Sequence, residues 1–351
     1  MGRRVAIALV MLAAGCGDDR FTGNGALIVT PTAGLEVSEM GTKAMFSVVM
    51  GMQPTANVHV TIDTSEITEA GTSPATITFD PINYDQPVIV TVRGSNDPID
   101  DGDQLVTIHL DAGSYGSADV VVTNEDDDTR GVTVTADPDL TTTEAGGVAT
   151  FKIVLVTQPT APVTFPITSS SPGEGVPSPD MVTFTDLNWN IAKTVTVTGT
   201  NDDLADGTAS YAIAIGAAVT SDPVYAGLDP DDVALRNTDD DTAGIAVTPT
   251  TGLVTTEAGG TATFTVVLTS EPTGDVTIPV ASSQATEATV STDLLVFTPS
   301  TWSTAQTVTI TGVDDGVPDG STGYRVVLGA ATSTDLGYAG IDPSDVDCTN
   351  E

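Results

Sequence analysis

The stretch TTEAGGVATFKIVL, residues 142–155, decides the fold, because two similar stretches lie at long distances on either side of it. VSEMGTKAMFSVVM spans residues 37–50, and TTEAGGTATFTVVL spans residues 255–268. The three stretches align Glu39, Glu144 and Glu257 at separations of 105 and 113 residues. Solenoid repeats are only about 20–50 residues long. The sequence therefore predicts whole domains in series.

The rest of each repeat keeps the same offsets. They relate Phe79, Phe184 and Phe297, and then Gly94, Gly199 and Gly312. Asn124 and Asn237 are 113 residues apart, so repeat 1 lacks eight residues late in its length. The expected organisation is a signal peptide at 1–15, a tether at 16–25, repeat 1 at 26–128, repeat 2 at 131–241 and repeat 3 at 244–351.

Within each repeat the pattern is that of β-strands. In repeat 2, Val195 and Val197 alternate with threonines at a period of two residues, which is typical of a strand with one buried face. The expected strands of repeat 2 are 132–135, 148–156, 163–168, 181–185, 193–199, 209–215 and 232–236. Seven short strands in such a length indicate an immunoglobulin-like β-sandwich. The predicted fold is all-β, with three tandem sandwiches.

The charge balance limits the partners. The chain has 48 Asp plus Glu against 10 Lys plus Arg, which gives a formal net charge of -38. Such a surface repels the phosphate backbone of nucleic acids and attracts cations. We therefore expect no nucleic-acid partner.

The first residues indicate export. Arg3 and Arg4 precede an apolar run that is too short to span a bilayer, and Ala13-Ala14-Gly15-Cys16 follows it. This segment resembles the lipobox of bacterial lipoproteins, which implies cleavage before Cys16 and acylation of its sulfur. The expected location is the bacterial cell envelope, lipid-anchored at the outer membrane or cell surface. The alternative is ordinary secretion with an unmodified Cys16.

Acidic residues recur in alternate connections between the strands. If successive strands run up and down, the loops that carry Glu144, Glu174, Asp202 and Asp239 meet at one end of the sandwich. The main metal-ligand candidates are Glu39, Asp97, Asp101, Asp126, Asp127 and Asp128 in repeat 1, and Glu144, Asp202, Asp206, Asp239, Asp240 and Asp241 in repeat 2. Secondary candidates are Glu69, Glu174, Glu257, Asp315 and Asp319.

Converging carboxylates need a compensating cation, since each like-charged pair costs about 1 kcal/mol at 4 Å even in bulk water. Oxygen ligands on flexible loops suit Ca²⁺, whereas Mg²⁺ demands a tighter octahedron. The alternative for a run such as 126–128 is a solvated linker that keeps the protein soluble.

The pattern T-E-A-G-G-x-A-x-F, an N-D-D turn and a closing N-x-D-D-D together resemble the Calx-β domain. The resemblance covers residues 26–351 and implies a two-sheet sandwich with an acidic, Ca²⁺-binding end. The ligands that it implies are Glu39, Asp97, Asp126 and Asp128 in repeat 1, and Glu144, Asp202, Asp239 and Asp241 in repeat 2. Pro98 stands where repeat 2 has Asp203, so the first site is expected to be the weaker. Repeat 3 lacks the closing Asp triplet, and we expect its site to be poor.

We interpret the chain as a non-catalytic, structural or adhesive array in which Ca²⁺ stiffens the junctions between domains. A cell-surface or matrix protein or glycan is the expected partner. The alternatives are a metal-free acidic spacer and a carboxylate-based glycoside hydrolase. His59 and His109 are expected on strand surfaces, and Cys348 in a buried strand. Trp189, Trp302 and Tyr84 share one aligned position, which favours a structural role.

Overall fold

The computed structural model describes residues 27–317 and 320–351, and β-strands make up nearly all of their regular structure. The chain divides into two compact units, residues 1–130 and residues 131–351. The first unit contains one β-sandwich and the second contains two, each with its own hydrophobic core. The predicted all-β fold of tandem immunoglobulin-like sandwiches is confirmed. The expected signal peptide, tether and Cys16 lie outside the described residues.

Repeat 1 contains β1 (Leu27–Thr30), β2 (Leu35–Ser38), β3 (Lys43–Met50), β4 (Val58–Thr64), β5 (Ala70–Ser73), β6 (Thr76–Phe79), β7 (Val88–Gly94), β8 (Gln104–Asp111), the 3₁₀ helix η1 (Gly113–Tyr115) and β9 (Ser117–Glu125). Repeat 2 contains β10 (Val132–Ala136), β11 (Thr141–Thr143), β12 (Val148–Leu155), β13 (Val163–Ser169), β14 (Gly175–Ser178), β15 (Met181–Phe184), β16 (Lys193–Gly199), β17 (Ala209–Ile215) and β18 (Val233–Thr238). Repeat 3 contains β19 (Ile245–Thr248), β20 (Leu253–Thr255), β21 (Thr261–Leu268), β22 (Val276–Ser282), β23 (Ala288–Val290), β24 (Leu294–Phe297), β25 (Gln306–Gly312), β26 (Thr322–Leu328), β27 (Thr332–Ser333) and β28 (Val346–Asn350). In 27–317 and 320–351, no helix is long and apolar enough to cross a membrane.

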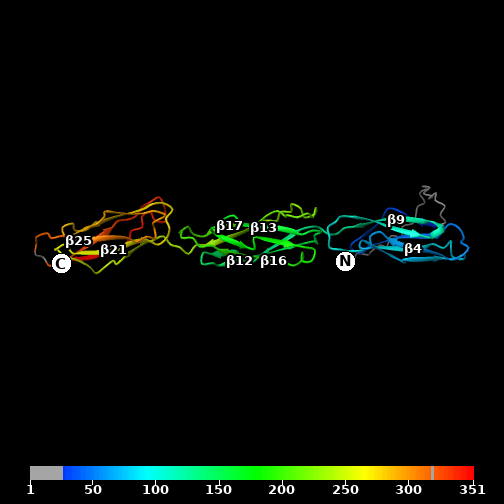
Figure 1. Cartoon of the computed structure of the whole chain (residues 1–351), viewed down its shortest axis with the longest axis horizontal. Coiled ribbons are helices and arrows are strands. Elements are labelled where there is room, and N and C mark those ends of the chain that lie inside the picture. Colours follow the sequence, from blue (N-terminus) through cyan, green and yellow to red (C-terminus); the bar gives the residue numbers. More distant parts are fainter. Residues whose placement is uncertain (1–26, 318–319) are drawn as a thin grey trace, which may run out of the picture. The chain divides into compact units, whose positions relative to one another are not determined.

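The two sheets of each sandwich have the same strand order in all three repeats. In repeat 2 one sheet runs β10-β12-β16-β14 and the other runs β11-β18-β17-β13-β15, and Figure 1 shows β12 and β16 in one layer with β13 and β17 in the other. Neighbouring strands are antiparallel except for β11 and β18, which are parallel. Repeats 1 and 3 have the same parallel pairs, β2 with β9 and β20 with β28.

The period-two pattern defines the core faces. Val195 and Val197 on β16 are fully buried, whereas the threonines between and beside them face outward or are half-buried. Repeat 2 has nine strands where the sequence predicted seven, because β11 and β14 were missed. β11 is three threonines, and β14 contains a glycine and a proline, so neither has the apolar alternation that identifies a strand.

The glycines at the end of β7, β16 and β25 are required by a close approach between the two sheets. A Cβ on Gly199 would overlap the carbonyl oxygen of Thr143 and the side chain of Asn237. Gly94 and Gly312 have the equivalent neighbours in repeats 1 and 3. Only a residue without a side chain fits there, which explains why this glycine is present in every repeat.

The expectations for Cys348, for the two histidines and for the three aligned aromatic residues agree with the structure. Cys348 is buried on β28, and the histidines lie exposed on β4 and β8. Partly buried aromatic side chains pack against the cores of their repeats, and these are Tyr84, Trp189 and Trp302. They support the fold.

Candidate metal centre

The parallel strand pair brings the acidic residues of repeat 1 together. Glu39 directly follows β2 and Asp126 directly follows β9, and Ser38 is aligned with Glu125 at the end of this pair. The amide of Glu39 donates to the carbonyl of Glu125 at 3.1 Å. The first acidic loop and the closing Asp run therefore leave the sandwich side by side.

Two groups of carboxylates in repeat 1 share one residue. Glu39, Glu69 and Asp97 each offer an oxygen within 4.8 Å of the others, and so do Glu39, Asp126 and Asp128. Glu39 lies between the two groups and belongs to both. The middle residue of the closing run, Asp127, is exposed and belongs to neither.

The side chain of Glu39 is buried and incompletely bonded. The residue is 4% exposed, and its Oε2 atom has no hydrogen-bond partner. Burial and the nearby carboxylates of Asp97, Asp126 and Asp128 raise the pKa of Glu39 to about 7. A buried oxygen without a partner is destabilising. A bound cation would supply the missing partner and the missing charge.

Asn124 is the second incompletely bonded group of this end. It is 1% exposed, its Nδ2 donates to Glu69 Oε2 at 3.1 Å and to the Ser95 carbonyl at 3.2 Å, and its Oδ1 has no partner. Burial raises the pKa of Glu69. In the sequence Asn124 stands out only by its alignment with Asn237, and the recurrence of this asparagine in each repeat was the signal for a structural role.

Repeat 2 builds one carboxylate group. Oxygens of Glu144, Asp239 and Asp241 lie within 4.8 Å of one another. Glu144 is 4% exposed, and burial together with Asp202, Asp239 and Asp241 raises its pKa to about 7. Unlike Glu39, Glu144 accepts a backbone hydrogen bond, from the amide of Asp240 at 3.3 Å. The Asp240 side chain itself is exposed.

The loop that carries Asp202 and Asp206 is joined to the closing run. The amides of Gly207 and Asp241 donate to the two carboxylate oxygens of Asp239, both at 2.6 Å. Asp202 accepts from the amide of Leu204 at 2.9 Å. Burial raises the pKa of Asp206, and Asp202 and Asp239 raise it further.

Repeat 1 has the equivalent loop. The amides of Gly102 and Asp128 donate to the oxygens of Asp126 at 2.7 and 2.8 Å. Burial raises the pKa of Asp101, and among the neighbouring charges Asp97 adds most to the shift. Asp97 belongs to one of the two groups of repeat 1 and Asp101 lies beside it, whereas Asp202 and Asp206 both lie beside the group of repeat 2.

A buried polar network supports the group of repeat 2. Thr142 Oγ1 donates to Asn237 Oδ1 at 2.9 Å and lies 2.9 Å from the hydroxyl of Tyr211. Asn237 Nδ2 lies 3.4 Å from Glu174 Oε2. In repeat 1, Glu69 is the equivalent partner of Asn124. Glu174 is half-buried and stands next to the group without belonging to it.

Repeat 3 keeps the network but not the carboxylate group. Asn350 bonds Glu287 Oε2 and the Thr255 hydroxyl at 3.3 and 3.0 Å. Glu257 is half-buried and Asp315 is exposed, and Asp319 lies outside the described residues. Among the residues that the structure describes, no three acids of repeat 3 come within metal-binding distance. The two described candidates of this repeat, Glu257 and Asp315, are therefore not part of such a group.

Within the second unit, the Asp202 loop also contacts repeat 3. The amide of Glu271 donates to the carbonyl of Asp203 at 2.6 Å, and Leu204 forms a parallel β-bridge with Glu271. One connection thus carries a candidate ligand and a main-chain contact to the following sandwich.

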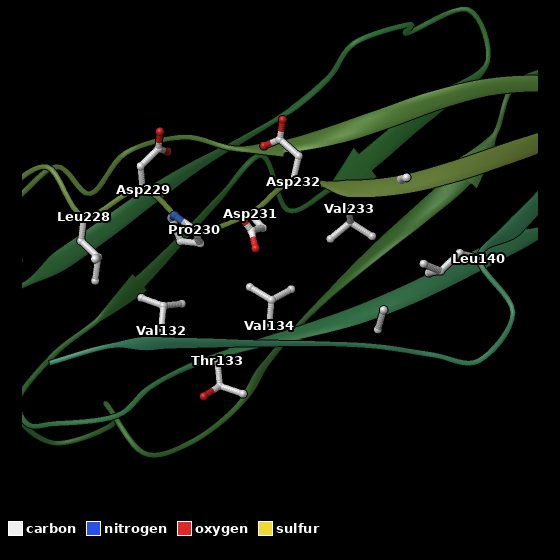
Figure 2. Close-up of a pocket in the computed structure, with 12 residues that line it drawn as sticks. Val132, Thr133, Val134, Leu140, Leu228, Asp229, Pro230, Asp231, Asp232 and Val233 are labelled. Atoms are coloured by element: carbon white, nitrogen blue, oxygen red, sulfur yellow. The ribbon is translucent and has the colours of Figure 1, made fainter. Parts of the chain in front are cut away.

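A hollow of repeat 2 lies away from the carboxylate groups. It has a volume of about 740 Å³, and Figure 2 shows Val132 and Val134 pointing from β10 toward the segment with Asp231 and Asp232, while Thr133 points away. Asp232 already accepts a hydrogen bond from the amide of Ile215 at 3.1 Å. No residue of the carboxylate groups lines it.

No protein-family model matches the chain, and no curated protein matches it. Among solved structures, the calcium-binding domain CBD12 of CALX1.1 is 17% identical with a TM-score of 0.29, covering 57% of this chain and 80% of that one. CBD12 from CALX1.2 is 18% identical with a TM-score of 0.27, at coverages of 57% and 83%. A protocadherin gammaB7 EC3-6 structure is 10% identical with a TM-score of 0.34, covering 93% and 73%. Likenesses at this level carry no argument about function.

Proposed function

We propose that this chain is a non-catalytic, calcium-binding array of Calx-β-like sandwiches in the bacterial cell envelope. One observation carries the proposal: the Oε2 atom of Glu39 is buried without a hydrogen-bond partner, in a carboxylate that belongs to two groups of three acids whose oxygens lie within 4.8 Å of one another. Nothing in the described segments neutralises this group, because no Lys or Arg forms an ion pair with it.

The donor set fits Ca²⁺. It consists of carboxylate oxygens on loops, which suit a large, hard cation with six to eight ligands. In repeat 1, the residues that would hold ions are Glu39 with Glu69 and Asp97, and Glu39 with Asp126 and Asp128. Repeat 2 would hold one ion through Glu144, Asp239 and Asp241. Repeat 1 would therefore hold more ions than repeat 2.

The ion would stiffen the segments that leave each sandwich. Asp126 and Asp128 lie on the segment that follows β9, so an ion shared with Glu39 fixes this segment to its own domain. In repeat 2, an ion that also draws in Asp202 would hold the loop that contacts Glu271 of repeat 3. Calcium would then act as a structural element of the array.

Attachment through an acylated Cys16, at the outer membrane or cell surface, is part of the same proposal. An array held there would present its sandwiches to a surface or matrix partner. Cys16→Ser is expected to move the protein from the membrane fraction to the soluble fraction, or to block processing, as fractionation and mass spectrometry would show. Normal cleavage with unchanged fractionation would refute the anchor.

Thermal unfolding of the full chain tests calcium binding. Binding to the native state alone contributes about 2.7 kcal/mol at a hundredfold excess over Kd, and extracellular sites often have a Kd of about 10⁻⁴–10⁻³ M. Millimolar Ca²⁺ should therefore raise the Tm well above the value in Mg²⁺ at equal ionic strength. Glu144→Gln should reduce the shift of the transition that Trp189 fluorescence reports in a Trp302→Phe background, and Asp180→Asn, at an exposed position outside the group, serves as the control. Equal shifts from both ions would leave only charge screening.

A metal-free acidic spacer is the second candidate. It is favoured by the backbone hydrogen bonds that the carboxylates of Asp97, Asp126, Asp202 and Asp239 accept, since these give the aspartates a role in turns without an ion. A spacer would show no Ca²⁺-specific shift in Tm. A carboxylate-based glycoside hydrolase is instead tested by screening the full chain for release of reducing sugar.

A further inference from the structure

Repeat 1 places two cations directly opposite each other on neighbouring strands. Lys43 on β3 is aligned with Arg93 on β7, and both side chains are exposed on the outer face of the sheet. Like charges in this position repel each other and weaken a sheet. In the described part of the chain, neither side chain forms an ion pair that would offset this repulsion.

The cation pair borders a hollow. It has a volume of about 490 Å³ and is lined by Lys43 and Arg93, by one acid, Glu39, and by neutral groups that include Gly71, Ser73, Ser95 and Asn96. Gly71 stands opposite Arg93 on β5, and a Cβ placed there would meet no atom within 4 Å. The hollow thus combines two positive charges, hydroxyl and amide donors, and open space above a glycine. Its size is that of a pocket for a small organic molecule.

The other two repeats have the same backbone without these features. In repeat 2 the aligned residues are Val148 opposite Thr198, with Val176 in place of Gly71. In repeat 3 they are Thr261, Thr311 and Thr289. The fold therefore does not require the cation pair or the glycine.

The rarity of cations strengthens the contrast. Ten Lys plus Arg residues stand against 48 Asp plus Glu in the chain, yet two of the ten face each other here. A group with several negative oxygens between them would convert the repulsion into two charge-assisted hydrogen bonds, with the guanidinium able to bind two oxygens at once.

We propose that this hollow binds an acidic sugar, with its carboxylate or sulfate between Lys43 and Arg93 and its ring above Gly71. The oxyanion supplies the charge that the pair lacks, and the neutral donors of Ser73, Ser95 and Asn96 face the sugar hydroxyls. Glu39 is not part of this proposed contact, so binding is expected without calcium.

Isothermal titration of the full chain tests the site, in buffer stripped of divalent metals by resin. The probes are glucuronate, glucose 6-sulfate, inorganic sulfate and, as the neutral control, glucose. Both acidic sugars should bind and glucose should not. Lys43→Val with Arg93→Thr installs the residues of repeat 2 and should weaken binding by about tenfold or more. Because this change removes a repulsion, the fold should be at least as stable, as circular dichroism would show.

Matched variants distinguish binding of an acidic sugar from binding of inorganic sulfate. They also test whether net charge alone explains the binding. Lys152→Thr with Arg236→Thr removes the same charge from exposed strand positions of repeat 2 and should leave binding unchanged. Gly71→Val should weaken binding of the acidic sugars while sparing inorganic sulfate. Equal binding by the Lys43/Arg93 double variant, or binding only when Ca²⁺ is added, would overturn the proposal. Sulfate binding without sugar binding would reduce the site to a simple anion site and overturn the assignment to sugars.

Discussion

Repeats 1 and 2 have the same sheets but differ in the polar groups beneath their acidic ends. In repeat 2, Asn237 Oδ1 accepts from the Thr142 hydroxyl, which in turn lies beside the Tyr211 hydroxyl. In repeat 1, Val37 and Val106 occupy the aligned positions, and Asn124 Oδ1 has no partner.

This difference shows which contacts the sandwich requires and which belong to the site. The asparagine donates to a glutamate and to a backbone carbonyl in both repeats, and the glycine beside it is present in both. The hydroxyl network is dispensable for the fold. The network is absent from repeat 1. In that repeat Glu39 has an unpartnered oxygen and belongs to two carboxylate groups.

Changing the shared glycine should have the largest effect. Gly199→Ala forces a Cβ into the Thr143 carbonyl, and a backbone clash of this kind should cost about 4 kcal/mol or more. Trp189 fluorescence in a Trp302→Phe background would follow the unfolding of repeat 2 in urea. Gly173→Ala is the matched control, because a Cβ there meets no atom within 4 Å. If Gly199→Ala and Gly173→Ala lower the stability of repeat 2 by the same small amount, the two sheets separate easily at this point.

The two buried glutamates should give the metal-free protein a pH dependence. Their pKa rises from an ordinary value of 4.5 to about 7 on folding, so the native state binds more protons than the unfolded state between these values. Stability should therefore fall as the pH rises from 4.5 through 7, by on the order of 3 kcal/mol per glutamate. The Tm measured at pH 5 and pH 8 checks this.

Glu39→Gln and Glu144→Gln should each flatten the pH profile of their own repeat, whereas Glu36→Gln, on an exposed strand position, should not. Calcium should abolish the fall at high pH if it binds the ionised forms. A Tm that rises steadily between pH 5 and 8 without metal would contradict the burial argument.

Exchanging the hydroxyl network between the repeats should have the smallest effect. Thr142→Val leaves Asn237 Oδ1 without a donor and should destabilise repeat 2 by about 1–3 kcal/mol. Thr141→Val, at an exposed position of β11, is the control. The reverse change, Val37→Thr, should stabilise repeat 1 by about 0.5–1 kcal/mol, as hydrogen exchange of β9 would report. No loss in Thr142→Val would mean that Tyr211 reaches Asn237 in its place.

Period-two alternation was sufficient to predict most strands, because each has one face against a core. The same alternation also predicted that the acidic loops lie at one end of a sandwich, since alternate connections of antiparallel strands share an end. β11 could not be predicted, because its pairing depends on Arg236 and Asn237, about 95 residues away. The unpartnered Glu39 oxygen, and the alignment of Lys43 with Arg93, depend on strand register, which one sequence does not contain.

The parallel pairing of the first and last strands of one sheet determines how a repeat responds to tension. β11 begins at the end of the sandwich from which β18 also begins, and the three residue pairs between them run from Thr141 and Arg236 to Thr143 and Thr238. A pull on the two chain ends therefore draws these strands past each other lengthwise. All of their hydrogen bonds then carry the load together, whereas a hairpin pulled from its open end would release them one by one. The parallel pairs β2 with β9 and β20 with β28 place hydrogen bonds in the same shear geometry in repeats 1 and 3.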